Sequence, residues 1–200
     1  MAEVGVPDPA AMRIDSLRLR TPTQRNRSLW TGASKAIGLP GAELWSGAVS
    51  IELLSTEAQE RQWRAFLWAL GGPENWFRMP LPCAEHPGGG IFVDEVGATG
   101  YTLDIASSAI SQTLLDAGQF LTIPLPSGRF RTVCLQALLA TDAAGKATAS
   151  FRPALTESPV AGATIISRTP FMPFSPADDD LAITWSEGIG QIAFDVEEAR

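Results

Sequence analysis

The residues best equipped for chemistry are Cys83, Glu85 and His86, which lie close together in a Pro/Gly-rich loop, residues 82–90. His86 is the only histidine of the chain, so it is the one imidazole that could act as a general base near neutral pH. A Cys–His pair performs nucleophilic chemistry only when hydrogen bonds hold the imidazole against the thiol. Nothing in this irregular loop fixes such a geometry. We therefore predict no catalytic residue here, and a histidine exposed on a surface loop.

The sequence supports neither a metal site nor a phosphate-binding site. Cys83, Cys134 and His86 are too few and too scattered for a zinc site. Gly88–Gly90 lacks the Lys-Ser/Thr that completes a phosphate-binding loop, and the adjacent Asp178–Asp180 lack the alternating spacing of a calcium loop. No two of the 22 acidic residues stand out as a pair for glycoside hydrolysis. The chain is predicted not to be an enzyme and to hold no metal or cofactor.

Composition favours assembly over catalysis. The 200 residues fit a single domain, 1–200, and only 18% of them are charged. The 15 basic residues comprise 13 Arg and two Lys, and Arg is enriched at protein interfaces where Lys is depleted. A GC-rich coding bias explains this skew equally well. The net charge of −7 argues against a protein that grips nucleic-acid phosphates, and no apolar run is long enough to span a membrane.

One helix is predicted over residues 56–70, in a chain that otherwise reads as strand and turn. Thr56 can cap its first turn, while Gly71 followed by Pro73 ends it. An apolar stripe with helical spacing should face the core, formed by Trp63, Phe66, Leu67 and Leu70. Trp68 lies off that stripe, so the helix is apolar on a second side, which a neighbouring subunit often covers.

Alternation of apolar and polar residues predicts the strands. An edge strand is expected at 13–20, and the clearest hairpin joins 181–185 to 192–196. Residues 1–12 read as a flexible lead-in, Thr21–Ser28 as a polar loop, and the Pro-rich stretch 169–176 receives no strand. The remaining strands are expected at 45–53, 75–81, 91–96, 101–106, 120–125, 130–140, 147–152 and 164–168. The fold class is thus mainly β with one flanking α-helix.

Several short sequence motifs occur in an order that is more specific than any one of them. In the first half, a Trp-led strand precedes a helix that ends in Phe-Leu-x-x-Leu-Gly-Gly at 66–72, and an aromatic strand follows at Trp76 and Phe77. In the second half come 116–123 (DAGQFLTI), 142–155 (DAAGKATASFRPAL) and 159–165 (PVAGATI). Together they resemble small tail proteins of long-tailed bacteriophages and prophages, above all the distal tail proteins. The sequence departs from that pattern at Gln119, where an acid is usual.

The resemblance implies a β-sandwich or split β-barrel of the tail-tube and distal-tail type. It also implies a structural virion protein, assembled in the host cytoplasm as a six-fold ring at the tail tip. The ring would join the tail tube protein to the hub protein near the tape-measure protein, and DNA would pass through it without specific binding. The alternatives are another tail component, either tube or terminator protein, and a carbohydrate-binding β-sandwich that uses exposed tryptophans.

Two sets of site residues follow from this reading. Subunit contacts are expected at Trp68, Arg25, Arg27 and Trp30. A channel for DNA should repel phosphate, and the base-free stretches 79–128 and 169–199 supply the candidate acids. The Arg-rich segment 13–27 should then lie away from the channel. The candidate channel-lining acids are Asp94, Glu95, Asp104, Asp116, Asp178, Asp179 and Asp180. The alternative is that these acids only keep a lightly charged protein soluble.

Overall fold

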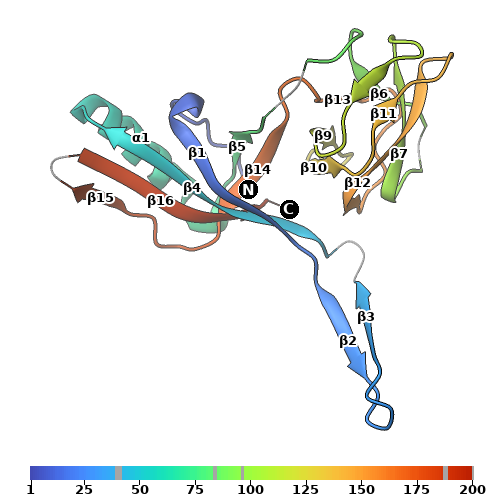
Figure 1. The fold of residues 1–200 in the computed structure, drawn as a ribbon. Helices are drawn as coiled ribbons and strands as arrows, with labels where there is room; N and C mark the ends of the chain where they lie inside the picture. The colour runs from blue at the N-terminus through green and yellow to red at the C-terminus, as the bar shows by residue number, and fades with distance from the viewer. Residues whose placement is uncertain (39–41, 83–84, 96, 187–188, 200) are drawn as a thin grey trace.

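The computed structural model spans residues 1–200 and describes all of them except 39–41, 83–84, 96, 187–188 and 200 (Figure 1). The described chain is mainly β with a single α-helix, as the sequence predicts. Two β units lie side by side, and a two-stranded arm projects away from both (Figure 1). Each unit has its own cluster of buried apolar side chains.

The first unit is a six-stranded sheet in the order β1-β4-β16-β14-β5, with β15 paired to β16. All of these pairings are antiparallel. The predicted edge strand and the predicted C-terminal hairpin are both confirmed. The strands are β1 (Met12–Arg20), β4 (Leu44–Leu54), β5 (Phe77–Pro80), β14 (Phe171–Pro176), β15 (Ile183–Ser186) and β16 (Ile189–Glu198).

The helix α1 (Glu57–Leu70) packs on this sheet through the predicted stripe. The Thr56 side chain accepts a hydrogen bond from the Gln59 N–H, and Gly71 ends the helix in the left-handed conformation. The stripe is buried in the same cluster as Val49 and Phe77. The Phe66 and Phe77 rings meet edge to face, with centroids 5.6 Å apart. A short 3-10 turn, η2 (Gly72–Glu74), follows the helix.

The second unit is inserted between β5 and β14 and comes close to forming a closed barrel. Its six strands run in the order β13-β6-β7-β12-β10-β9. An isolated bridge between Thr122 and Ile166 brings β9 back beside the segment of β13. A separate pair, β8 (Thr113–Leu115) with β11 (Leu139–Ala140), lies next to it. The barrel strands are β6 (Ile91–Val93), β7 (Gly100–Ser107), β9 (Phe120–Pro124), β10 (Phe130–Leu135), β12 (Lys146–Leu155) and β13 (Thr164–Ile165).

Buried polar contacts join the two units. The Trp45 indole N–H of β4 donates to the Thr132 carbonyl of β10 at 2.8 Å. The hydroxyls of Thr122 and Thr132 both donate to the Phe171 carbonyl, at 2.6 and 2.7 Å. The Arg131 guanidinium donates to the Glu198 carboxylate at 2.7 Å, deep in the interior. Because these groups are buried and hydrogen-bonded, they fix how the barrel sits on the sheet.

The prediction of a loop over Thr21–Ser28 is wrong. The segment contains β2 (Thr23–Arg27), which pairs with β3 (Ser34–Gly38) to form the arm. Every residue of β2 is polar and exposed, so the strand has no buried face to produce alternation. At the tip, the Ser28 N–H donates to the Ala33 carbonyl at 2.9 Å, and Gly32 adopts a φ of +69° that suits a tight turn.

Two further segments differ from the sequence-based expectation. Residues 2–4 of the expected lead-in lie along Trp76: the Val4 N–H donates to the Trp76 carbonyl, and the Trp76 N–H donates to the Ala2 carbonyl. A 3-10 turn, η1 (Pro9–Ala11), follows and is capped by Asp8. The Pro-rich segment 169–176 contains β14, which is buried throughout and pairs with β5 and β16.

The part of the chain that the structure describes contains no helix with the length and apolar character that a membrane crossing requires.

Candidate subunit-interaction surfaces

The arm, residues 23–38, exposes apolar side chains at its tip. Leu29 and Trp30 are each 97% exposed, and Ile37 of β3 is 45% exposed. The two arm strands belong to a sheet of their own, paired with each other and with no other described strand. An isolated two-stranded hairpin is marginally stable in water. The arm is therefore a candidate surface for contact with a partner.

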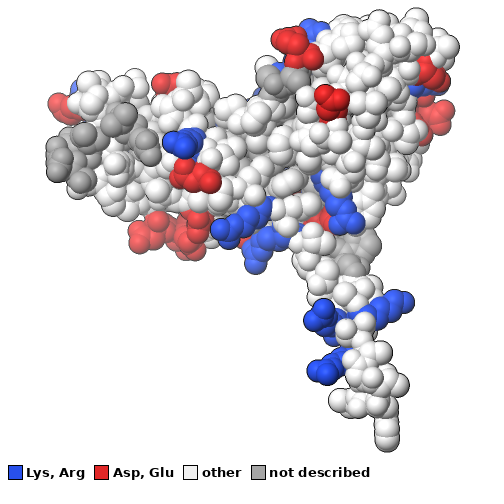
Figure 2. Space-filling model, viewed as in Figure 1, with Lys and Arg blue, Asp and Glu red and all other residues white. Residues whose placement is uncertain are grey.

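Positive charge accompanies these apolar side chains. Arg25, Arg27 and Lys35 lie on the arm, and the sequence has no acid between Asp15 and Glu43. Figure 2 shows basic side chains projecting sideways from the middle of the arm. The predicted interface residues Arg25, Arg27 and Trp30 thus share one exposed hairpin.

Trp68, the fourth predicted interface residue, lies elsewhere. It is 73% exposed on the outer side of α1, with the Arg64 guanidinium 5.9 Å from its ring centroid. Arg64 is in turn paired with Glu60 one helical turn earlier. Helix and arm stand at different ends of the first unit (Figure 1). No sequence pattern predicts that these two surfaces are separate.

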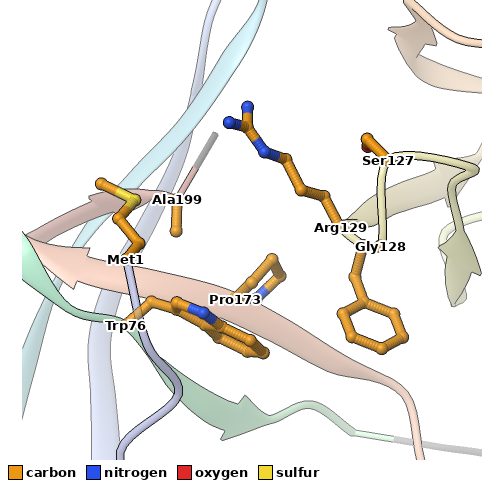
Figure 3. Close-up of a pocket in the computed structure, with 8 residues that line it drawn as sticks. Met1, Trp76, Ser127, Gly128, Arg129, Pro173 and Ala199 are labelled. Atoms are coloured by element: carbon orange, nitrogen blue, oxygen red, sulfur yellow. The ribbon is translucent and has the colours of Figure 1, made fainter.

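A pocket at the junction of the two units is a further candidate surface. It has a volume of about 480 Å³, and we call it the junction pocket (Figure 3). The Trp76 and Phe130 rings flank it, with centroids 6.2 Å apart. The Arg78 guanidinium lies 5.3 Å from the Phe130 centroid, behind that wall. The residues that line the pocket are Met1, Trp76, Ser127, Gly128, Arg129, Phe130, Pro173 and Ala199.

The sheet face that does not bury α1 carries a line of acids. On β16, Ile192 and Val196 point into the core, whereas Ala193 and Asp195 are exposed on the opposite face. A hollow of about 330 Å³ lies on this face. Its carboxylates are those of Asp15, Asp178, Asp180 and Asp195. Asp15 and Asp195 are absent from the sequence-based set because only strand pairing brings them beside the 178–180 segment.

The seven predicted channel acids do not form one surface. Asp94, Glu95, Asp104 and Asp116 belong to the barrel unit, whereas 178–180 belong to the connection between β14 and β15. Several barrel acids have partners of their own. Asp94 accepts a 2.7 Å hydrogen bond from Lys146, which raises the pKa of that ammonium, and Asp104 accepts one from Thr148 at 2.6 Å. The candidate acids thus lie on two parts of the molecule, and their position along a channel stays a prediction.

Part of the Arg-rich segment 13–27 lies on the same face as these acids. A second hollow on the same face is lined by Arg18 and Arg20 together with Asp195 and Glu197. Arg20 and Glu197 form an exposed ion pair at 2.8 Å. The sheet face that does not bury α1, which we call the bare sheet face, is thus acidic at one end and mixed in charge at the other.

His86 is buried, so the prediction of a surface-loop histidine is wrong. Its Nε2 lies 2.7 Å from the Ser167 hydroxyl, and its Nδ1 lies 3.0 Å from the Pro87 carbonyl. The Arg168 guanidinium donates to the carbonyls of His86 and Gly88. His86 is 6% exposed and Ser167 is 5% exposed, so both side chains are shielded from solvent. These contacts fasten the 86–88 loop to the segment that returns to β14.

The cysteines and the acids give no metal centre among the described residues: no group of three or more His, Cys, Asp or Glu side chains is placed to hold an ion. Cys134 is a free, half-buried thiol, and burial raises its pKa. Cys83 lies outside the described residues.

Neither a comparison with protein-family models nor one with curated proteins finds a match for this chain.

Proposed function

We propose that this protein is a structural subunit of the tail of a long-tailed bacteriophage or prophage. It forms a ring at the distal end of the tail, joins the tail tube to the hub, and leaves a channel for DNA. The proposal combines the ordered resemblance to distal tail proteins with a β fold that carries one flanking helix. Its partners would be further copies of itself, the tube protein, the hub protein and the tape-measure protein, within a virion assembled in the host cytoplasm.

The arm is the observation that carries this proposal. Residues 23–38 leave the body as a hairpin whose tip side chains, Leu29 and Trp30, are almost fully exposed. Exposed indole and Leu side chains on a projecting hairpin are costly for a free monomer and useful for an assembly subunit. These exposed side chains are typical of a subunit of a larger assembly.

The separation of the interaction surfaces favours a ring. Trp68 and the arm lie on different parts of the molecule, so one copy can offer the arm while its neighbour offers another surface. Contacts between unlike surfaces build head-to-tail assemblies, which close when the rotation between neighbours permits. Six copies is the number that the resemblance implies.

The bare sheet face supplies an inner surface of suitable charge. We infer that the face with Asp15, Asp178, Asp180 and Asp195 borders the channel, because carboxylates there repel the phosphates of passing DNA. Arg20 on that face is paired with Glu197, which limits its attraction for phosphate. Replacing Asp178, Asp180 and Asp195 together by Lys should leave tails assembled but slow the ejection of DNA.

Labelling of purified particles tests the function itself. Antibodies against this chain should bind at the tip of tails from cells that produce them, and deletion of the gene should leave tails without a completed tip. Label on capsids, or particles that assemble fully without the chain, would contradict the proposal.

A carbohydrate-binding module is the second candidate, and the exposed rings of Trp68 and Trp185 favour it. Trp185 on β15 is 59% exposed, and exposed indoles can stack on sugar rings. Binding of the isolated chain to a glycan array, lost in Trp185→Ala, would support this function over the ring.

A further inference from the structure

We propose that Trp30 at the arm tip of one copy inserts into the junction pocket of a second copy. This inference rests on the proposed function and specifies its subunit contact: the donor surface, the acceptor surface and the anchoring side chain. The arm and the junction pocket are then the two complementary halves of one interface.

The arm has the reach for such a contact. Each arm strand has five residues, and a strand advances by about 3.4 Å per residue, so the hairpin spans roughly 17 Å before its tip. The arm points away from the body that carries its own pocket (Figure 1). Its tip is thus placed to meet another molecule rather than its own chain.

The size of the pocket and the residues that line it suit an indole ring. Its volume of about 480 Å³ exceeds that of a Trp side chain, and its walls include the rings of Trp76 and Phe130 together with Pro173 and Ala199. Aromatic rings favour edge-to-face contacts with a further ring. Arg129 also lines the pocket, and Figure 3 shows its side chain extending away from the Trp76 ring, which leaves its guanidinium available for a cation–π contact with an inserted indole.

Charge on either side of the pocket matches the arm. Two adjoining hollows share Ala199 with the junction pocket, and they carry Glu157 and Glu197. Arg25, Arg27 and Lys35 accompany Trp30, and no acid lies among them. Insertion of the tip places its cations beside the Glu157 carboxylate and the Arg20–Glu197 ion pair, although Arg129 opposes part of this attraction. Complementary charge of this kind selects the orientation in which two surfaces dock.

A disulfide between the two surfaces tests the contact. Trp30→Cys and Ser127→Cys are combined in a chain whose natural cysteines, Cys83 and Cys134, are replaced by Ala. Cells that produce this variant together with its neighbouring genes are oxidised, and the chain is recovered with its own antibody. Because Ser127 lines the pocket and is exposed, the pair should join neighbouring copies into a ladder of oligomers under non-reducing conditions.

The matched control combines Trp30→Cys with Ser55→Cys, an exposed serine just before α1, and should give no ladder. A ladder in the control but not in the test variant, a cross-link within one chain, or a cross-link only to a different protein would overturn the proposal. A chain that labels tail tips yet gives no ladder would refute this contact alone. A ladder without label on tails would refute the phage function alone.

A second measurement uses copies carrying two different tags. Trp30→Ser should reduce their co-precipitation by roughly tenfold or more, as expected for an anchor residue, whereas Trp30→Phe should retain most of it. Because Trp30 is 97% exposed, neither change should alter the fold, which circular dichroism checks. Equal co-precipitation of the Ser and Phe variants would contradict an aromatic anchor.

Discussion

Replacement of Arg131 by Met should cost a large part of the stability of this protein. Arg131 is 4% exposed, and its guanidinium donates to the Glu198 carboxylate at 2.7 Å, the Glu43 carbonyl at 2.9 Å and the Ala154 carbonyl at 3.2 Å. Met fills similar space but donates nothing. Removing one partner of a buried ion pair costs about 3–5 kcal/mol, because the other charge stays buried. The total free energy of unfolding of most domains is about 5–15 kcal/mol.

The neighbouring ion pair between Arg20 and Glu197 provides a matched control. Arg20 and Glu197 form an ion pair of nearly equal length, 2.8 Å, but their side chains are exposed. Exposed pairs contribute about 0–1 kcal/mol, so Arg20→Met should change the free energy of unfolding little. Urea denaturation of the two variants measures the difference. A loss in Arg131→Met no greater than the loss in Arg20→Met would refute the assigned role of the junction.

The same variant also tests how the two cores are coupled. Arg131 belongs to the barrel, whereas Glu198 belongs to the sheet that carries the helix. Weakening this contact should separate the unfolding of the two units into distinguishable steps. The double variant Arg131→Met/Glu198→Leu should recover part of the loss, since both buried charges are then removed.

Three further predictions concern single positions. Thr56→Ala should lower the free energy of unfolding by about 1 kcal/mol, measured by urea denaturation, because it removes the helix cap. Thr56→Ser should keep most of that stability, because serine can also cap the helix. Backbone N–H donors from Lys146 and Ala144 lower the pKa of Asp142 below its ordinary 3.8. This stabilisation exists above pH 3.8 and disappears as pH falls through the lowered value, so Asp142→Asn should destabilise near neutral pH but not in strong acid. With Cys83 replaced, Cys134 should react with iodoacetamide at pH 8 more slowly than a model thiol, because its pKa is raised.

Elements with local signals are the ones that the sequence predicts well. The helix has Thr56 at one end and Gly71 at the other, and both act as predicted. The hairpin of β15 and β16 and the edge strand β1 show alternation because each has one buried and one exposed face. The exposed position of Trp68 follows from helical spacing alone.

The sequence misses elements that lack a local signal and contacts whose partners lie far away in the chain. The arm lacks alternation because its first strand is polar and exposed on both faces. His86 lies in a loop, but Ser167, which buries and bonds it, is 81 residues away. The junction pocket joins residues from both ends of the chain, Trp76 just before β5, the 127–130 segment and β14. Only the assembled fold brings these segments together.

A cryo-EM reconstruction of the intact tail tip tests the central claim most directly. It should show copies of this chain around the channel, each with its arm on the next copy and Trp30 in the junction pocket of that copy, against the Trp76 and Phe130 rings. The sheet face with Asp178 and Asp195 should point toward the channel. Copies that do not touch one another, or a tip that lacks this chain, would contradict the ring.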